Sequence, residues 1–138
     1  MKRLLITIAS LLVLAGCASD DEILNAGTGV RLTTVANAYT APGNAEYVLR
    51  NDTDTTLQVP TCEGQLVIIV EKLVGGAWTQ IANPPCPGAI TQTTMAPGGT
   101  AGGSKPVTTP GNYRLRVIFT ATGGVGNFEV LSNEFAVN

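Results

Sequence analysis

Beyond about residue 30, apolar and polar residues of this chain alternate with a period of two, not with the wider spacing of a helix. The clearest case is residues 113–119, where Tyr, Leu, Val and Phe alternate with two arginines and an isoleucine. Residues 30–35 and 46–50 show the same alternation. Because a strand places successive side chains on opposite faces, these segments are predicted to be strands with one buried face.

Shorter signals predict the remaining strands. Residues 66–73 are apolar except for Glu71 and Lys72, so this segment is expected to be a strand buried on much of both faces. Turn residues separate it from its neighbours, and a bulge is expected at Ser132–Asn133. Together the remaining segments predict a sandwich or barrel without helices; they are residues 57–62, 66–73, 78–81, 91–95, a weak strand near 100–107, and 128–137.

The first 29 residues follow a different pattern. A cationic start, Met1-Lys2-Arg3, precedes an uncharged apolar run over residues 4–14 and two small residues. This order is typical of a secretory signal, so residues 1–16 are predicted to be removed. The apolar run is about half the roughly 20 residues that a membrane-spanning helix needs. Residues 17–29 are small and polar, which predicts a flexible tether.

The end of the signal carries a further motif. Leu14-Ala15-Gly16-Cys17 resembles the bacterial lipobox. The resemblance implies that the Cys17 sulfur takes a diacylglyceryl group, that cleavage occurs before it, and that the new amine is acylated. Two or more acyl chains hold a protein stably on a membrane. Ala18, where Asp would resemble an inner-membrane retention signal, favours the outer membrane in a Gram-negative cell. The alternative is an ordinary signal peptide that ends near a cysteine.

The other cysteines follow from this assignment. With Cys17 lipidated, Cys62 and Cys86 remain as an even pair in an oxidising compartment, which predicts a disulfide. Closing a loop of this length stabilises a fold by about 3–4 kcal/mol on the chain-entropy model. A zinc site lacks ligands because the chain has no histidine and no Cys-x-x-Cys. Two free buried thiols are the alternative, and no cofactor is predicted.

Charge excludes one class of partner. The chain has 8 basic and 10 acidic residues, and loss of Lys2 and Arg3 with the signal leaves 6 against 10, a net charge of −4. Without a cluster of basic residues, nucleic acid is not an expected partner. The membrane, reached through the lipid, and another envelope protein are the expected partners.

Candidate catalytic groups are few, and an enzyme is not predicted. No histidine is present to serve as general base, and none of the mature serines lies in a Gly-x-Ser-x-Gly turn. Ser104 and Lys105 are adjacent, so on a strand they point to opposite faces and form no catalytic pair. The glutamates are expected on solvated faces; they are Glu46, Glu63, Glu71, Glu129 and Glu134.

One segment offers a weak calcium candidate. Asn51, Asp52 and Asp54 supply the hard oxygens that Ca²⁺ prefers. No full ligand set with a bidentate glutamate at fixed spacing follows them. A plain turn, in which Asn and Asp side chains bond to nearby backbone amides, is therefore the preferred interpretation.

Aromatic and charged residues give the remaining candidates. Trp78 and Tyr39 are considered as exposed anchors of a binding surface, although core or sheet-face packing is the preferred role for Trp78. Arg114 and Arg116 lie on one face of a strand, and Arg50, with Glu46, is expected to oppose them in cross-strand charge pairs.

Several turn-and-strand sequences carry a second resemblance. They are Tyr-Val-Leu-Arg-Asn-Asp-Thr-Asp at residues 47–54, Ala-Pro-Gly-Gly-Thr at 96–100, Pro-Gly-Asn-Tyr-Arg-Leu at 110–115 and Ser-Asn-Glu-Phe-Ala-Val at 132–137. This series resembles bacterial immunoglobulin-like or fibronectin-III-like envelope domains, and also the BsuPI-type proteinase-inhibitor domain. The resemblance implies an all-β fold, an immunoglobulin-like β-sandwich of seven to eight antiparallel strands over residues 30–138.

The two resemblances imply two functions. The first is a membrane-anchored envelope lipoprotein that acts as a non-enzymatic binding or structural module, with its partner unknown. The second is a proteinase inhibitor, for which the segment Pro84-Pro85-Cys86-Pro87 is the candidate inhibitory loop. Sandwich folds host many unrelated activities, so the fold by itself does not decide between them.

Overall fold

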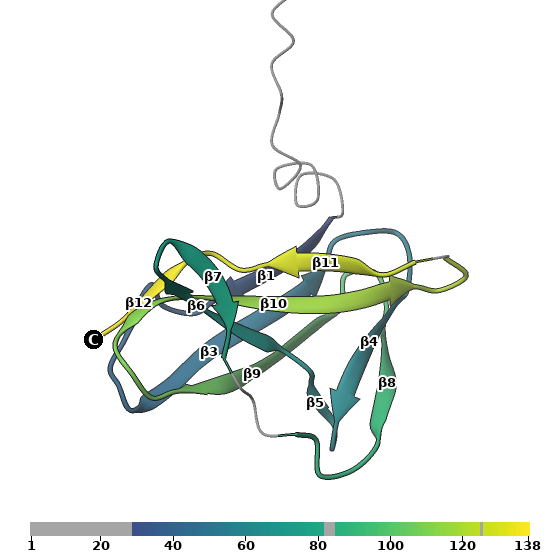
Figure 1. The fold of residues 1–138 in the computed structure, drawn as a ribbon. Coiled ribbons are helices and arrows are strands. Elements are labelled where there is room, and N and C mark those ends of the chain that lie inside the picture. The colour runs from purple at the N-terminus through teal and green to yellow at the C-terminus, as the bar shows by residue number, and fades with distance from the viewer. Residues whose placement is uncertain (1–28, 82–84, 125) are drawn as a thin grey trace, which may run out of the picture.

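The computed structural model describes residues 29–81, 85–124 and 126–138, which form two β-sheets packed face to face (Figure 1). The expected all-β sandwich over residues 30–138 is confirmed. Within the described ranges, no helix is long and apolar enough to cross a membrane. The expected signal peptide, Cys17 and the tether up to residue 28 lie outside the described residues.

The smaller sheet has three antiparallel strands in the order β1-β3-β9. They are β1 (Val30–Thr34), β3 (Gly43–Asn51) and β9 (Thr100–Val107). Along β3 the alternation of the sequence becomes an alternation of burial, because Ala45, Tyr47 and Leu49 face the core while the residues between them are exposed.

The larger sheet is centred on β10 (Gly111–Ala121). One edge of β10 pairs with the last two strands of the chain, and the other pairs with a hairpin. These strands are β11 (Phe128–Leu131), β12 (Phe135–Val137), β6 (Ile69–Val74) and β7 (Ala77–Gln80). The core lies between the two sheets, where Leu49, Val107, Leu115 and Val117 are fully buried.

A third ladder extends from the far end of β10. There β10 pairs with β4 (Leu57–Cys62), which in turn pairs with β5 (Gln65–Leu66) and, over its whole length, with β8 (Ile90–Met95). We refer to β4, β5 and β8 together as the β4–β8 arm. In constant-type immunoglobulin domains, whose strands are lettered A to G along the chain, one sheet has the order A-B-E-D, so strand D pairs with strand E. Here β9 is in the position of E, and β8 pairs with β4 instead.

The expected bulge at Ser132–Asn133 is confirmed and separates β11 from β12. Arg116 pairs with Leu131 and Tyr113 pairs with Phe135, so two residues of β10 face three residues of the opposing strand. The hydroxyl of Ser132 fills the gap, because it accepts a hydrogen bond from the Leu115 N–H at 2.8 Å.

The described residues form twelve strands, more than the expected seven to eight. Besides the bulge, the apolar segment at residues 66–73 is divided, because Leu66 pairs with Thr61 of β4 whereas residues 69–72 pair with β10. A two-residue strand, β2 (Ala38–Tyr39), was not predicted. Because β2 runs parallel to β12, not every pairing is antiparallel, as the prediction had it.

Candidate functional site

The predicted disulfide is present and joins the end of β4 to the loop before β8. Cys62 and Cys86 are bonded across 24 residues of sequence. The bond therefore fixes the described part of this loop, from Pro85 to Gly88, against the β4–β8 arm. Pro84 lies outside the described residues.

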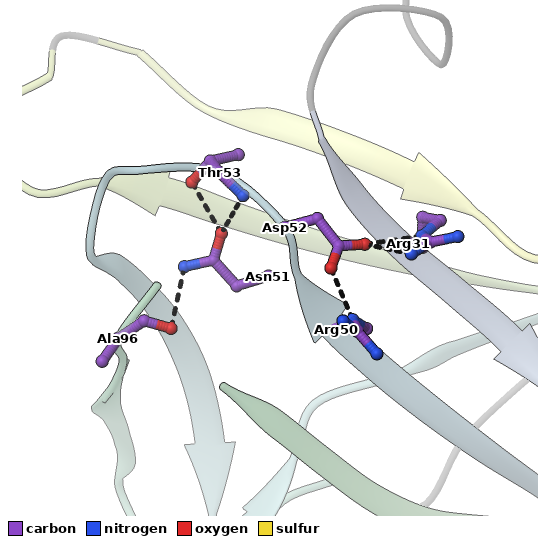
Figure 2. A network of polar contacts seen from close by, with 6 residues as sticks. All are labelled: Arg31, Arg50, Asn51, Asp52, Thr53 and Ala96. Atoms are coloured by element: carbon purple, nitrogen blue, oxygen red, sulfur yellow. Dashed lines mark hydrogen bonds and ion pairs between the residues drawn. The ribbon is translucent and has the colours of Figure 1, made fainter. Parts of the chain in front are cut away.

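The predicted turn at residues 51–54 is built around a buried amide (Figure 2). The Asn51 side chain has no exposed surface, and its Oδ1 accepts hydrogen bonds from the Thr53 N–H at 3.0 Å and the Thr53 hydroxyl at 2.6 Å. Its Nδ2 donates to the carbonyl oxygens of Thr55, Met95 and Ala96 at 2.9–3.1 Å. The amide is therefore fully used inside the protein, where it joins two turns.

The other oxygens of the calcium candidate point elsewhere. Asp52 forms ion pairs with Arg31 and Arg50, which approach it from neighbouring strands (Figure 2). The hydrogen bond from Arg50, and then that from Arg31, holds the pKa of Asp52 below its ordinary value. Asp54 is exposed, and among the described residues its carboxylate accepts a hydrogen bond from the Thr55 hydroxyl at 3.2 Å.

The geometry therefore argues against the calcium candidate and supports the plain turn. The Asn51 oxygen faces inward to Thr53, while two guanidinium groups neutralise the carboxylate of Asp52. Across the residues described, no three or more His, Cys, Asp or Glu side chains group in a way that could hold a metal ion.

Charged residues on the outer face of the larger sheet form a second network. Glu71 is only 6% exposed, and its two oxygens lie 2.7 Å from Arg114 Nε and 3.0 Å from Arg116 Nε. Arg116 also reaches Glu129 at 3.1 Å. Arg114 stacks over the ring of Trp78, 4.5 Å from its centroid. The network joins β6, β7, β10 and β11 across their outer surface.

This network corrects two expectations. Glu71 is buried and not solvated, because two arginines of β10 cover it. Arg50 does not oppose Arg114 and Arg116, since β3 belongs to the other sheet and Arg50 pairs with Asp52. Trp78 packs on the face of the sheet, which is one of the two packing roles that the sequence analysis preferred for it.

Tyr39 is a packing residue and not an exposed anchor. Its ring meets Phe135 edge to face, with the ring centroids 5.4 Å apart. Its hydroxyl donates to the Glu46 carbonyl and accepts from the Ala36 N–H, each at 3.0 Å.

The outer edge of β9 is the part of the described structure best suited to binding. The Asn51 N–H donates to the Gly99 carbonyl, which fixes the phase of the β3–β9 ladder. Alternate residues of an antiparallel strand bond to the same neighbour. The N–H and C=O groups of Thr100, Gly102 and Ser104 therefore point away from β3, and no described residue bonds to them.

A groove runs along this edge, and we call it the β9 groove. It consists of two adjoining hollows of about 610 and 400 Å³ that share Gln65, Leu66 and Ser104. One wall is β9, and the β4–β8 arm forms the other, with Thr93 lining the first hollow and the disulfide lining the second. Figure 1 shows β9 and this arm as separate parts of the fold.

Two side chains give the groove its chemistry. Tyr47 is 3% exposed, and its hydroxyl lies over Gly103, where a Cβ atom would approach it to 2.6 Å. Burial raises the pKa of Tyr47, and no described residue bonds to its hydroxyl. Lys105 is half-buried in the second hollow, its pKa is lowered by burial, and it forms no ion pair with a described residue.

The groove contains the Ser104–Lys105 pair considered in the sequence, and it also contains groups that sequence reasoning did not identify. Ser104 is exposed while Lys105 points inward beside buried Ala45, so the two adjacent residues lie on opposite faces as expected. Sequence reasoning did not identify Tyr47 or the open edge. The available signal was the Gly102–Gly103 pair, since glycine inside a strand often marks a place where another backbone approaches closely.

Comparisons with known proteins assign no family. No family model matches the chain, and no curated protein sequence matches it. Among solved structures, Pseudomonas fluorescens alkylpurine DNA glycosylase AlkC, bound to DNA containing an abasic site analog, aligns with a TM-score of 0.41 and 11% identity over 82% of this chain. The ASH/PapD-like domain of human CEP192 aligns with a TM-score of 0.35 and 11% identity over 93% of it.

The β-glucosidase of Listeria innocua, in complex with gluconolactone, has a TM-score of 0.30 and 14% identity over 77% of this chain. The alignments span 31% of the glycosylase chain, 95% of the CEP192 domain and 16% of the glucosidase chain. Similarity at this level does not bear on activity.

Proposed function

We propose that this chain is a bacterial envelope lipoprotein, anchored through acyl chains on Cys17, whose sandwich binds another envelope component without catalysing a reaction. The lipobox-like residues 14–17 support the anchor. The observation that carries the binding role is the β9 groove, which contains backbone groups and one lysine, Lys105, that no described residue bonds to or pairs with. In a Gram-negative cell, Ala18 favours the outer membrane.

The disulfide supports an exported location. Cys62 and Cys86 are bonded, and such bonds persist in oxidising compartments and are rare in the cytosol. With these two cysteines used, Cys17 is the remaining thiol of the chain. The disulfide is the pairing that the sequence predicts, and the lipidation of Cys17 is part of the proposal.

The anchor point suits the position of the groove. The Gly29 carbonyl accepts a hydrogen bond from the Asp52 N–H at 2.7 Å, so the chain enters the sandwich beside the Asn51 turn. Thr100 lies at this same end, paired with Arg50, and the Lys105 end of β9 is about 17 Å farther along. The tether from Cys17 to Gly29 reaches at most about 40 Å. With the proposed anchor, the groove lies within about 60 Å of the membrane surface.

Lipidation can be tested on the full chain expressed in a bacterial host with labelled palmitate. We expect the wild-type chain to incorporate label, to lose residues 1–16 and to partition into detergent. Cys17→Ser should do none of these, while its 62–86 disulfide still forms. An unlabelled wild-type protein with an unacylated start by intact mass would refute the anchor.

The proteinase-inhibitor alternative stays a prediction, and one observation favours it. Pro85 and Pro87 are exposed on a loop that the Cys86 disulfide holds in place, as a rigid inhibitory loop requires. The test is to measure the activity of a panel of serine and cysteine proteases with the full chain in excess. Unchanged activity across the panel would remove this alternative.

A further inference from the structure

We propose that the β9 groove binds one extended peptide segment of a partner protein, which adds to β9 as a fourth strand of the β1-β3-β9 sheet. The proposal rests on the binding role proposed above and names its ligand class. Strand addition of this kind takes affinity from main-chain hydrogen bonds and specificity from alternate side chains.

The backbone of β9 provides the required pattern. Thr100, Gly102 and Ser104 each direct an N–H and a C=O outward, and no described residue bonds to these groups. The groups recur every second residue, at about 6.6 Å, which is the repeat of a pairing strand. Pro106 ends the pattern on the same side, because proline has no N–H to donate.

The side chains along β9 leave the path clear. Gly102 and Gly103 have no side chains, so an incoming backbone can approach to pairing distance. Beneath Gly103, the hydroxyl of the largely buried Tyr47 lines the first hollow with no described hydrogen-bond partner. It can donate to, or accept from, the ligand.

The opposite wall limits the occupant to a single strand. Gln65, Leu66 and Thr93 of the β4–β8 arm face β9 across the first hollow. Each hollow, about 610 or 400 Å³, is in the size range of pockets that hold small ligands. A second copy of the sandwich would bring a whole sheet to β9 and would meet this wall, so an isolated segment is the better fit.

Charge specifies one position of the ligand. Lys105 points into the second hollow, is half-buried and forms no ion pair with a described residue. Glu63 lines the same hollow and Glu46 the first, but both are exposed and neither pairs with Lys105. A ligand residue opposite Lys105 directs its side chain to the same face. We therefore infer that the ligand carries Asp or Glu at this position.

The experiment uses the full chain, purified in detergent micelles, and two peptide libraries as probes. Each library has twelve-residue peptides with one fixed central residue, Glu in one and Gln in the other, flanked by randomised Thr, Val, Ser and Tyr. We expect the wild-type chain to enrich members of the Glu library more strongly. The dissociation constant of an enriched peptide is then measured by fluorescence anisotropy.

Two variants test the geometry of binding. Ser104→Pro removes an outward N–H but no hydrogen bond to β3. Proline at an outward position is compatible with this strand, because Pro106 already occupies one. Ser104→Pro should bind the enriched peptide at least about fivefold more weakly than Ser104→Ala, which keeps the N–H. Lys105→Gln should remove the preference for Glu over Gln and leave the affinity for the Gln peptide unaltered.

A modified ligand keeps the test independent of folding. Peptides N-methylated at alternate residues lose the donors on one edge only, so one methylation phase should abolish binding and the other should not. No enrichment from either library, or equal loss with both phases, would overturn the proposal. A wild-type dimer that Ser104→Pro converts to monomer would assign the edge to a second copy instead. Either result leaves palmitate labelling of Cys17, and hence the anchor, untouched.

Discussion

The side chain of Asn51 links two turns that lie 44 residues apart in the sequence. Asparagine is common in turns because its short amide bonds to nearby backbone groups, and that part of its role is predictable. Its second role is not local, since the same amide also satisfies the carbonyls of Met95 and Ala96. Sequence reasoning predicted only a plain turn at Asn51, because nothing near it in the sequence indicates these partners.

Asn51→Ala should destabilise the fold by about 2–4 kcal/mol, because it leaves buried carbonyls and an N–H unpaired. Urea unfolding monitored by Trp78 fluorescence measures the difference. Asp54→Ala is the matched control in the same turn and should change the free energy of unfolding by less than about 0.5 kcal/mol. Equal effects of the two substitutions would refute the structural role of Asn51.

Asp52 should make stability depend on acid. Its pKa is lowered in the fold, chiefly by the Arg50 hydrogen bond and then by that from Arg31. Its contribution is therefore fully present above the ordinary pKa of 3.8 and is lost as pH falls through the lowered folded-state pKa. The difference in unfolding free energy between wild type and Asp52→Asn should be small, as expected for an exposed pair, and should shrink below pH 3.8. A difference that grows on acidification would contradict this.

At the scale of the element, β9 shows where propensity misleads. Glycine, serine and proline between residues 100 and 107 predict only a weak strand, yet β9 pairs with β3 over all eight residues. Proline is tolerated because Pro106 lies at an outward position of an edge strand, where no donor is needed. The strands with strict alternation, such as β3 and β10, were predicted well. The pairing of β8 with β4 depends on long-range packing, which a local pattern does not encode.

The Glu71 network joins four strands of the larger sheet, β6, β7, β10 and β11. Glu71→Ala should destabilise the protein by about 1–3 kcal/mol, because it leaves Arg114 and Arg116 partly buried without their carboxylate. Thermal unfolding followed by circular dichroism measures the effect. Glu129→Ala, which removes a more exposed partner of Arg116, should cost less than about 1 kcal/mol. The reverse order would show that Glu71 is not the centre of this network.

For the whole molecule, the sequence predicts the fold class and the disulfide but not the groove. Segments in which apolar and polar residues alternate, together with the two cysteines Cys62 and Cys86, are sufficient to predict a disulfide-bonded sandwich. The groove combines Tyr47, residues 64–66, Thr93 and residues 101–106, which come together only through the tertiary fold. The groups that the groove offers to a ligand are mainly backbone N–H and C=O groups. Every strand has such groups, whatever its sequence, so no residue pattern reveals them. Those of β9 are distinguished by their place on a sheet edge that no described strand covers and that lies beside the groove.

The Cys62→Ser/Cys86→Ser double variant should lose about 3–4 kcal/mol of stability on the chain-entropy model for a loop of 24 residues. Guanidinium unfolding of the non-reduced proteins measures it. Cys17→Ser, which leaves the disulfide in place, is the control and should unfold at the same denaturant concentration as the wild type. A double variant as stable as this control would show that the bond does not constrain the unfolded chain.

The β4–β8 arm also has a consequence for aggregation. An uncovered strand is a template on which further chains can stack, and long stacks of this kind become amyloid-like fibrils. A strand accepted by β9 would have Gln65, Leu66 and Thr93 on its far side, so the next chain would find that side obstructed. Growth therefore stops after one addition. The protein can therefore keep an open strand edge without seeding its own polymerisation.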